Sequence, residues 1–116
     1  MIKTANDFIL EAQQACQCID SKRAQQLLND TETGVIIDVR EPSEAAQSCI
    51  NGSINIPRGL LEMKIQSHCP ESSQLILIHC AAGGRASLAA ARLQEMGYNN
   101  VYAITEKYHT IKTVLA

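Results

Sequence analysis

Aromatic side chains are nearly absent from this chain of 116 residues, which has no tryptophan and 3% aromatic residues in all. Its net charge of −2 gives no basic excess. Proteins that bind nucleic acids use positive charge to hold phosphates and aromatic rings to stack on bases. We therefore expect no nucleic-acid partner, and a core built from leucine, isoleucine, valine and alanine.

Long apolar runs are also missing. The longest aliphatic stretches are much shorter than the ~20 residues that a membrane-spanning helix needs. Residues 1–18, MIKTANDFILEAQQACQC, mix charge and glutamine among the apolar positions and lack the continuous apolar stretch of a signal peptide. These features predict no membrane partner and a cytoplasmic location.

The cysteines form no evident disulfide or metal framework. Their number is odd and the chain has no export signal, which favours reduced thiols. The five are Cys16, Cys18, Cys49, Cys69 and Cys80. The Cys16–Cys18 pair has two interpretations, a partial metal site or two small semi-buried residues near a helix end. We favour the second, because no other cysteine pair or closely spaced histidine pair completes a zinc set. We expect no metal.

Short apolar strands alternate with amphipathic helical segments along the chain. Helices are predicted at 4–15, 21–30, 58–67, 86–97 and 106–116, with a turn or short helix at 41–48. Strands are predicted at 18–19, 35–38, 52–57, 74–80 and 100–104. The alternation predicts an α/β fold with a mostly parallel sheet of about five strands and helices on both faces. We expect one domain over residues 1–116, with residues 1–17 as a helical extension packed on it.

A cysteine stands between the strongest predicted strand and the best predicted helix, in LILIHCAAGGRASLAAARL at 75–93. Ligands of parallel α/β sheets bind beyond the carboxyl ends of the strands, and Asp38 and Cys80 both lie at such ends. Unpaired N–H groups at a helix start stabilise a thiolate. The residues between Cys80 and Arg85 are small, so the loop can curl into a cup of inward-pointing amides. The predicted loop comprises Cys80, Ala81, Ala82, Gly83, Gly84, Arg85 and Ala86.

Four motifs are similar to those of the rhodanese (thiosulfate sulfurtransferase) superfamily, and they occur in the family order between about Ile19 and Ile104. CAAGGRAS resembles the family's active-site loop in its C-x-x-G-x-R form, and VIIDVREPSE resembles its D-V-R-E-P motif. INGSINIP resembles I-P-G-A-I-N-I-P, and LQEMGYNNVYAI resembles L-x-x-x-G-Y-x-N-V-Y. The resemblance implies a single-domain, rhodanese-like protein.

The resemblance also implies a sulfurtransferase reaction, with Cys80 as the catalytic nucleophile. The Cys80 thiolate would take the outer sulfur of thiosulfate or a similar small anionic donor and become a persulfide. Cyanide or a thiol, including a protein thiol, would then accept that sulfur. Arg85 would hold the donor's oxyanion or lock the loop. No metal or organic cofactor is implied.

Three alternatives remain open beside thiosulfate sulfurtransferase activity. Cysteine-dependent phosphatases of related fold carry H-C-x5-R, whereas only four residues separate Cys80 from Arg85 here. A tighter cup favours one sulfur atom over a tetrahedral phosphate, so we rank a phosphatase below a sulfurtransferase. An arsenate reductase is a second alternative, which we rank no higher than the phosphatase. A non-catalytic rhodanese-like binding or regulatory module is the third alternative, and the presence of Cys80 counts against it.

Three further residues are candidates for supporting roles. Asp38 and Arg40 match the family's D-V-R. For Asp38 we favour an architectural role that braces the loop over direct catalysis, and we expect Arg40 to pair with Glu44 or nearby backbone. Arg58 either attracts an anionic donor or is a solvated surface arginine, and we favour the second. Alternation along the strand turns the His79 side chain away from that of Cys80, so we expect a hydrogen-bonded strand residue rather than a general base.

The chain departs from the family pattern at three places. Cys49 replaces a histidine, and we interpret it as a filler rather than a second redox-active thiol. Ala81 stands where many members carry arginine, which removes one cation from the mouth of the loop. The family's L-x-G-G-I-x-x-W ending is replaced by ITEKYHTIKTVL, so the usual glycine pair and tryptophan are absent.

Overall fold

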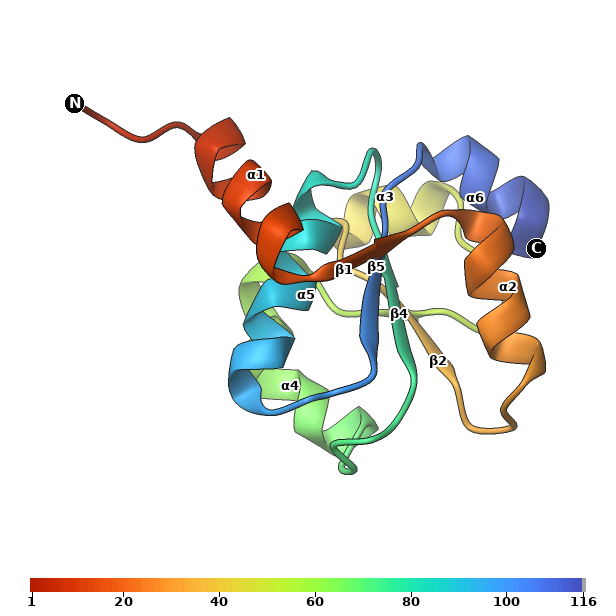
Figure 1. Cartoon of the computed structure of the whole chain (residues 1–116). Helices are drawn as coiled ribbons and strands as arrows, with labels where there is room; N and C mark the ends of the chain where they lie inside the picture. The colour runs from red at the N-terminus through yellow and green to blue at the C-terminus, as the bar shows by residue number, and fades with distance from the viewer. Residues whose placement is uncertain (116) are drawn as a thin grey trace.

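The computed structural model describes residues 1–115 and is built from five strands and six α-helices in alternation (Figure 1). The strands are β1 (Gln17–Ile19), β2 (Val35–Asp38), β3 (Ile54–Asn55), β4 (Ile76–His79) and β5 (Val101–Ile104). The helices are α1 (Ala5–Ala15), α2 (Ser21–Asn29), α3 (Pro42–Gln47), α4 (Leu61–His68), α5 (Gly84–Met96) and α6 (Tyr108–Leu115). A short 3-10 turn, η1 (Arg58–Leu60), leads into α4.

The strands form one sheet in the order β1-β5-β4-β2-β3, and every neighbouring pair is parallel. The predicted α/β fold with a parallel sheet of about five strands is therefore confirmed. β4 occupies the centre of the sheet, and its register places His79 opposite Asp38 of β2. The residues that follow β2 and β4 thus emerge at the same edge, beside each other.

Alternation along the strands divides the core into two apolar layers. On one face Ile37, Ile78 and Ala103 pack with the alanine-rich side of α5 and with α4. On the other face Leu77 and Ile104 pack with α2 and α6. Figure 1 shows the same arrangement, with α1, α4 and α5 on one side of the sheet and α2 and α6 on the other. Helices cover both faces, as a parallel sheet requires.

The helix boundaries follow local signals in the sequence. Thr4 caps α1 by accepting a hydrogen bond from the Asp7 amide, and Asp20 caps α2 in the same way. Gly97 ends α5 with φ of 111°, which confirms the predicted glycine cap. α5 begins at Gly84, two residues before the predicted start, because the small residues of the loop continue directly into helical backbone. The final predicted helix included Ala116, which lies outside the described residues.

Two absences among residues 1–115 bear on the membrane-bound and metal-binding classes of protein considered above. Within residues 1–115 no helix combines the length and the apolar character needed to cross a membrane. Over the same residues no group of three or more histidine, cysteine or acidic side chains lies close enough together to hold a metal ion.

Candidate active site

Cys80 follows the central strand β4 directly, and its sulfur lies beneath the loop that leads into α5. The residue is 1% exposed. Its Sγ accepts hydrogen bonds from the backbone amides of Gly83, at 3.1 Å, and Ala86, at 3.4 Å. The first is the residue before α5 and the second lies in its first turn, where amides lack intrahelical partners. Two backbone dipoles therefore point at the sulfur and favour negative charge on it.

The loop takes its shape from Gly83, whose φ is 106°. A side chain is strained in that conformation. Space is also limiting there, because a Cβ on Gly83 would lie 3.0 Å from the Cα of Thr105, which follows β5. Both restrictions explain why a glycine stands at this position of the loop.

Hydrogen bonds from two other elements hold the loop in place. The backbone amide of Tyr108, the first residue of α6, donates to the carbonyl oxygen of Ala81 at 2.9 Å. The Ser87 hydroxyl donates to the carbonyl oxygen of Gly83 at 2.7 Å. Ala81 and Ala82 themselves are exposed, so only methyl groups project from the outer part of the loop.

Helix α1 packs against the beginning of α5, next to the loop (Figure 1). A Cβ on Gly84 would lie 2.9 Å from the Cδ1 of Ile9, so the end of the Ile9 side chain packs directly on the backbone of this glycine. The Gln13 side-chain amide donates to the Ser87 hydroxyl at 3.2 Å. Residues near the N-terminus thus contact the segment that carries Cys80 and Arg85.

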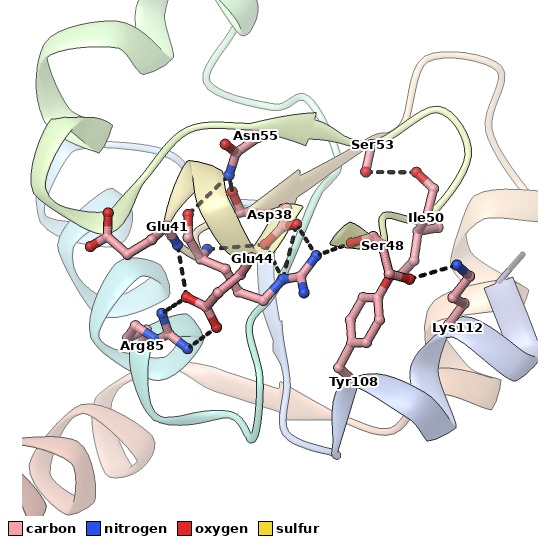
Figure 2. Close-up of polar contacts among 11 residues, drawn as sticks. Asp38, Glu41, Glu44, Ser48, Ile50, Ser53, Asn55, Arg85, Tyr108 and Lys112 are labelled. Atoms are coloured by element: carbon pink, nitrogen blue, oxygen red, sulfur yellow. Dashed lines mark hydrogen bonds and ion pairs between the residues drawn. The ribbon is translucent and has the colours of Figure 1, made fainter. Parts of the chain in front are cut away.

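The guanidinium of Arg85 is held by the carboxylate of Glu44 from α3 (Figure 2). Its Nη1 donates to Oε1 at 2.6 Å and its Nη2 to Oε2 at 3.1 Å. The bonds to Arg85 lower the pKa of Glu44 to about 2. The same pair raises the pKa of Arg85, with a smaller contribution from the nearby Cys80. The arginine of the loop is therefore locked to α3 and lies within electrostatic reach of the sulfur.

The predicted pairing of Arg40 with Glu44 is wrong, because Glu44 binds Arg85 instead. Arg40 forms a buried ion pair with Asp38, in which its Nε and Nη2 donate to the carboxylate at 2.7–3.1 Å. Its Nη2 also donates to the carbonyl oxygen of Ser48, so the expected backbone contact is present. Asp38 is fully buried and lies at the same edge as Cys80, where it holds Arg40.

Tyr108 of α6 covers Arg40 from the other side. The guanidinium carbon lies 4.0 Å from the centre of the Tyr108 ring, and the phenol oxygen lies 2.9 Å from the Ser48 hydroxyl (Figure 2). Lys112, one turn further along α6, donates to the same hydroxyl at 2.7 Å. α6 thus closes this side of the site with a tyrosine and a lysine, in the region where the family's glycine pair and tryptophan are missing.

The side chain of His79 faces Tyr108, away from the α5 face on which Cys80 packs, with 5.8 Å between the ring centres. The orientation is as predicted, but the expected hydrogen bonds are not formed. His79 is fully buried, and neither ring nitrogen has a hydrogen-bond partner among residues 1–115. Burial lowers the pKa of His79, so the ring is neutral in the folded protein.

Arg58 and Cys49 lie outside the loop contacts described above. Arg58 donates to Glu62 at 2.9 Å and lines a groove of about 310 Å³ between η1, α1 and α5, beside Arg92. Cys49 is exposed just after α3. Whether either residue takes part in the chemistry stays a prediction.

Sequence reasoning missed the partners of the candidate site residues rather than the residues themselves. The sequence names Glu44 only as a partner of Arg40, and it does not single out Ser48 or Tyr108 for a role at the site. A partial signal existed for Glu44, since Glu41 and Glu44 stand three apart at the start of α3, where the Glu41 amide donates to Glu44. No comparable signal marks Ser48 or Tyr108.

The comparisons with known proteins agree with the motifs. A family model described as the rhodanese-like domain matches residues 20–112. A sulfurtransferase from Allochromatium vinosum is 35% identical over 83 residues, which cover 72% of this chain and 76% of the relative. The thiosulfate sulfurtransferase PspE from Escherichia coli is 35% identical over 65 residues, 56% of this chain and 62% of the relative.

Among solved structures, a protein of unknown function from Rhodopseudomonas palustris, described as a possible tyrosine phosphatase, superposes with a TM-score of 0.84. It is 25% identical, and the match covers 97% of this chain and 92% of that one. The family match spans every strand except β1, together with the Cys80 loop and the Asp38–Arg40 pair. The chain therefore belongs to the rhodanese-like domain family.

Proposed function

We propose that this protein is a sulfurtransferase that carries sulfane sulfur as a persulfide on Cys80. The observation that carries the proposal is the placement of the Cys80 sulfur under two backbone amides at the start of α5. Amides aimed at a sulfur stabilise an anionic thiolate, and they stabilise an anionic persulfide equally well. Relatives named as sulfurtransferases support the same reaction class.

In the first half of the proposed reaction, the Cys80 thiolate attacks the outer sulfur of thiosulfate. A sulfur–sulfur bond forms to Cys80, the bond between the two sulfurs of thiosulfate breaks, and sulfite leaves with the electron pair. The backbone amides of Gly83 and Ala86, which donate hydrogen bonds to the thiolate before the reaction, then donate them to the persulfide anion that forms. The outward methyl groups of Ala81 and Ala82 leave the loop free of bulky side chains on the exposed side.

In the second half, a nucleophilic acceptor attacks the outer persulfide sulfur and Cys80 leaves as the thiolate. With cyanide the product is thiocyanate, and with a thiol it is a new persulfide. Each half-reaction exchanges one anionic nucleophile for another, so no net proton transfer is needed. This removes the requirement for a general base, in agreement with the neutral, buried state of His79.

Arg85 is the cation that we assign to the donor's oxyanion. Its side chain is 34% exposed while it binds Glu44, so the ion-paired Arg85 side chain keeps access to solvent. Arginine presents donors in a planar fork, which suits the oxygens of a sulfonate-like group. Glu44 fixes the direction of that fork and also places a negative charge beside it.

Steady-state production of thiocyanate from thiosulfate and cyanide tests the proposal. We expect turnover by the wild type and none above background for Cys80→Ala. Cys49→Ser is the matched control, because it removes an exposed thiol outside the loop and should retain full turnover. Equal turnover by wild type and Cys80→Ala would exclude a Cys80 persulfide.

A phosphatase is the second candidate, because the Rhodopseudomonas palustris structure that covers 97% of this chain is described as a possible tyrosine phosphatase. The loop argues against it, since four residues lie between Cys80 and Arg85 and tyrosine phosphatases use five. An aryl phosphate assay separates the two. Hydrolysis that depends on Cys80, with no sulfur transfer, would favour the phosphatase. If neither substrate reacts, an arsenate reductase and a non-catalytic module are the remaining interpretations.

A further inference from the structure

Two cysteines lie together where α1 ends and β1 begins, and the chemistry of Cys80 uses neither. Cys16 is the residue after α1, and Cys18 is the middle residue of β1. Their sulfur atoms are 3.7 Å apart, and the Cys18 sulfur lies 3.9 Å from the carbonyl oxygen of Gln13. This is the contact distance of two thiols that share a hydrogen bond.

The backbone holds the two side chains on one face. Cys16 is extended, with φ of −101° and ψ of 171°, and Cys18 continues as a strand residue. Residues two apart in extended chain point to the same side, and a rise of about 3.3 Å per residue puts their Cα atoms about 6.6 Å apart. Disulfides span Cα separations of about 4.4–6.8 Å and Cβ separations of about 3.5–4.5 Å. The Cα separation is at the upper end of its range, while the two sulfur atoms already lie 3.7 Å apart. A bridge therefore requires side-chain rotation together with a local contraction of the extended chain at Gln17.

The two thiols differ in access to solvent. Cys18 is exposed, whereas Cys16 is 9% exposed. Burial, together with the neighbouring Cys18, raises the pKa of Cys16 to about 12. Cys16 thus stays protonated in the reduced protein, and a solvent-borne oxidant reaches Cys18 first.

We propose that Cys16 and Cys18 form a reversible disulfide in response to hydroperoxides, with Cys18 as the reacting thiol and Cys16 as the resolving thiol. In the first step the Cys18 sulfur attacks the peroxide, the O–O bond breaks, and Cys18 becomes a sulfenic acid while an alcohol or water leaves. In the second step the Cys16 sulfur attacks the Cys18 sulfur, and the hydroxyl leaves with the Cys16 proton as water. Two thiols and one hydroperoxide give one disulfide, one alcohol and one water.

This pair is independent of the proposed sulfur transfer. Ala103 lies opposite Cys18 in β5, and Ile78 lies opposite Ala103 in β4, two residues before Cys80. Two strand spacings of about 4.8 Å therefore separate Cys18 from the strand that carries Cys80. The disulfide is a modification of the α1–β1 junction, and its formation does not require Cys80.

Peptide mapping after peroxide treatment tests the proposal. The full chain carrying Cys80→Ser is reduced, exposed to one equivalent of hydrogen peroxide, alkylated and digested with trypsin. We expect peptide 4–22 to lose the mass of two hydrogen atoms and to take up no alkyl group. Dithiothreitol should restore two alkylatable thiols. Recovery of both cysteines in alkylated form, or a bridge to Cys49 or to a second chain, would overturn the proposal.

Single variants assign the two roles. With Cys16→Ala, oxidation should stop at a Cys18 sulfenic acid, which dimedone traps. With Cys18→Ser, a change at an exposed position, Cys16 should remain alkylatable after the same treatment. Cys49→Ser is the matched control and should leave the loss of two hydrogen atoms unchanged. If Cys16→Ala does not fold, the parent chain and Cys18→Ser test the proposal without it. Oxidation of Cys16 in Cys18→Ser would contradict the assignment of Cys18 as the thiol that reacts first.

Discussion

The carboxylate of Glu44 holds the guanidinium of Arg85 through two hydrogen bonds, of 2.6 and 3.1 Å, across the gap between α3 and α5. The arginine of the Cys80 loop is therefore oriented by a residue 41 positions earlier in the chain. The ion pair determines the net charge beside the Cys80 loop. It also determines how readily the Arg85 guanidinium can bind an anion.

Glu44→Gln should lower the KM for thiosulfate roughly threefold and leave kcat nearly unchanged. The change keeps the size of the side chain, removes a negative charge that repels the anionic donor, and releases Arg85. Together these changes should alter the affinity for thiosulfate by less than a factor of ten. Steady-state kinetics at low and at high salt measure it, and the gain should shrink as salt screens the charges. An unchanged or higher KM at low salt would show that Glu44 helps binding by holding Arg85.

The same pair predicts a pH dependence of stability. The pKa of Glu44 is lowered to about 2 in the folded protein, below its ordinary value of 4.5. A lowered carboxyl pKa gives a stabilisation that is fully present above about pH 4.5 and lost as pH falls toward 2. The difference in unfolding free energy between wild type and Glu44→Gln should therefore narrow over that interval. Urea denaturation at pH 5, 4 and 3 measures it, and a difference independent of pH would contradict the assignment.

Asp38→Asn should destabilise the fold by about 3–5 kcal/mol, because removing one partner of a buried ion pair leaves an uncompensated buried charge. The side chains of Arg40 and Asp38 are 6% and 0% exposed. Glu62→Gln breaks the more exposed pairs with Arg58 and Arg92 and is the matched control, with an expected loss below about 1 kcal/mol. Urea denaturation of both variants gives the comparison. Equal losses would mean that the Asp38–Arg40 pair does not organise the fold.

Gly83→Ala and Gly84→Ala should differ strongly although they are neighbours. At Gly83 a Cβ meets the backbone of Thr105 and the φ of 106° is strained for alanine, at a cost of about 1–3 kcal/mol. At Gly84 a Cβ meets only the flexible end of the Ile9 side chain. Gly83→Ala should also slow alkylation of Cys80 by iodoacetamide, since the Gly83 amide no longer points at the sulfur. Similar thermal stability and alkylation rates in the two variants would contradict this view of the loop.

His79→Phe should stabilise the protein, and more so at pH 5 than at pH 7. Phenylalanine keeps a flat ring at this position and removes two nitrogens that have no hydrogen-bond partner within residues 1–115, which is worth about 1 kcal/mol. The pKa of His79 is lowered by burial, so the unfolded chain binds a proton that the folded protein excludes, and stability is lost as pH falls below 6.5. Melting temperatures at the two pH values test this. A variant less stable than wild type at pH 5 would show that the ring makes a required polar contact.

Much of the fold follows from the sequence because its signals are local. The continuous apolar run before Cys80 predicts a buried central strand, and the alanines of α5 predict a helix packed closely on the sheet. The predicted ends of two parallel strands place Asp38 and Cys80 at the same edge of the sheet. The small residues after Cys80 then predict the loop. The single domain over residues 1–116, the extension of residues 1–17 and the cytoplasmic location stay predictions.

The errors concern side-chain partners that depend on how distant elements are placed. The sequence predicts Glu44 or nearby backbone as the partner of Arg40. The backbone contact with Ser48 is present, but Glu44 of α3 binds Arg85 of α5 instead. Tyr108 reaches Arg40 only because α6, which follows β5 in the chain, lies beside the segment that follows β2. No local signal shows that the nitrogens of His79 lack partners among the described residues, since a strand pattern shows which way a ring points and not what surrounds it.

The mass of the intact protein after incubation with thiosulfate, in the absence of an acceptor, tests the central claim most directly. Our account predicts a gain of one sulfur atom at Cys80 in wild type and in Cys49→Ser, which cyanide removes as one equivalent of thiocyanate. Cys80→Ala should gain nothing. An unchanged mass of the wild type, or an equal gain in Cys80→Ala, would contradict the assignment of Cys80 as the sulfur carrier.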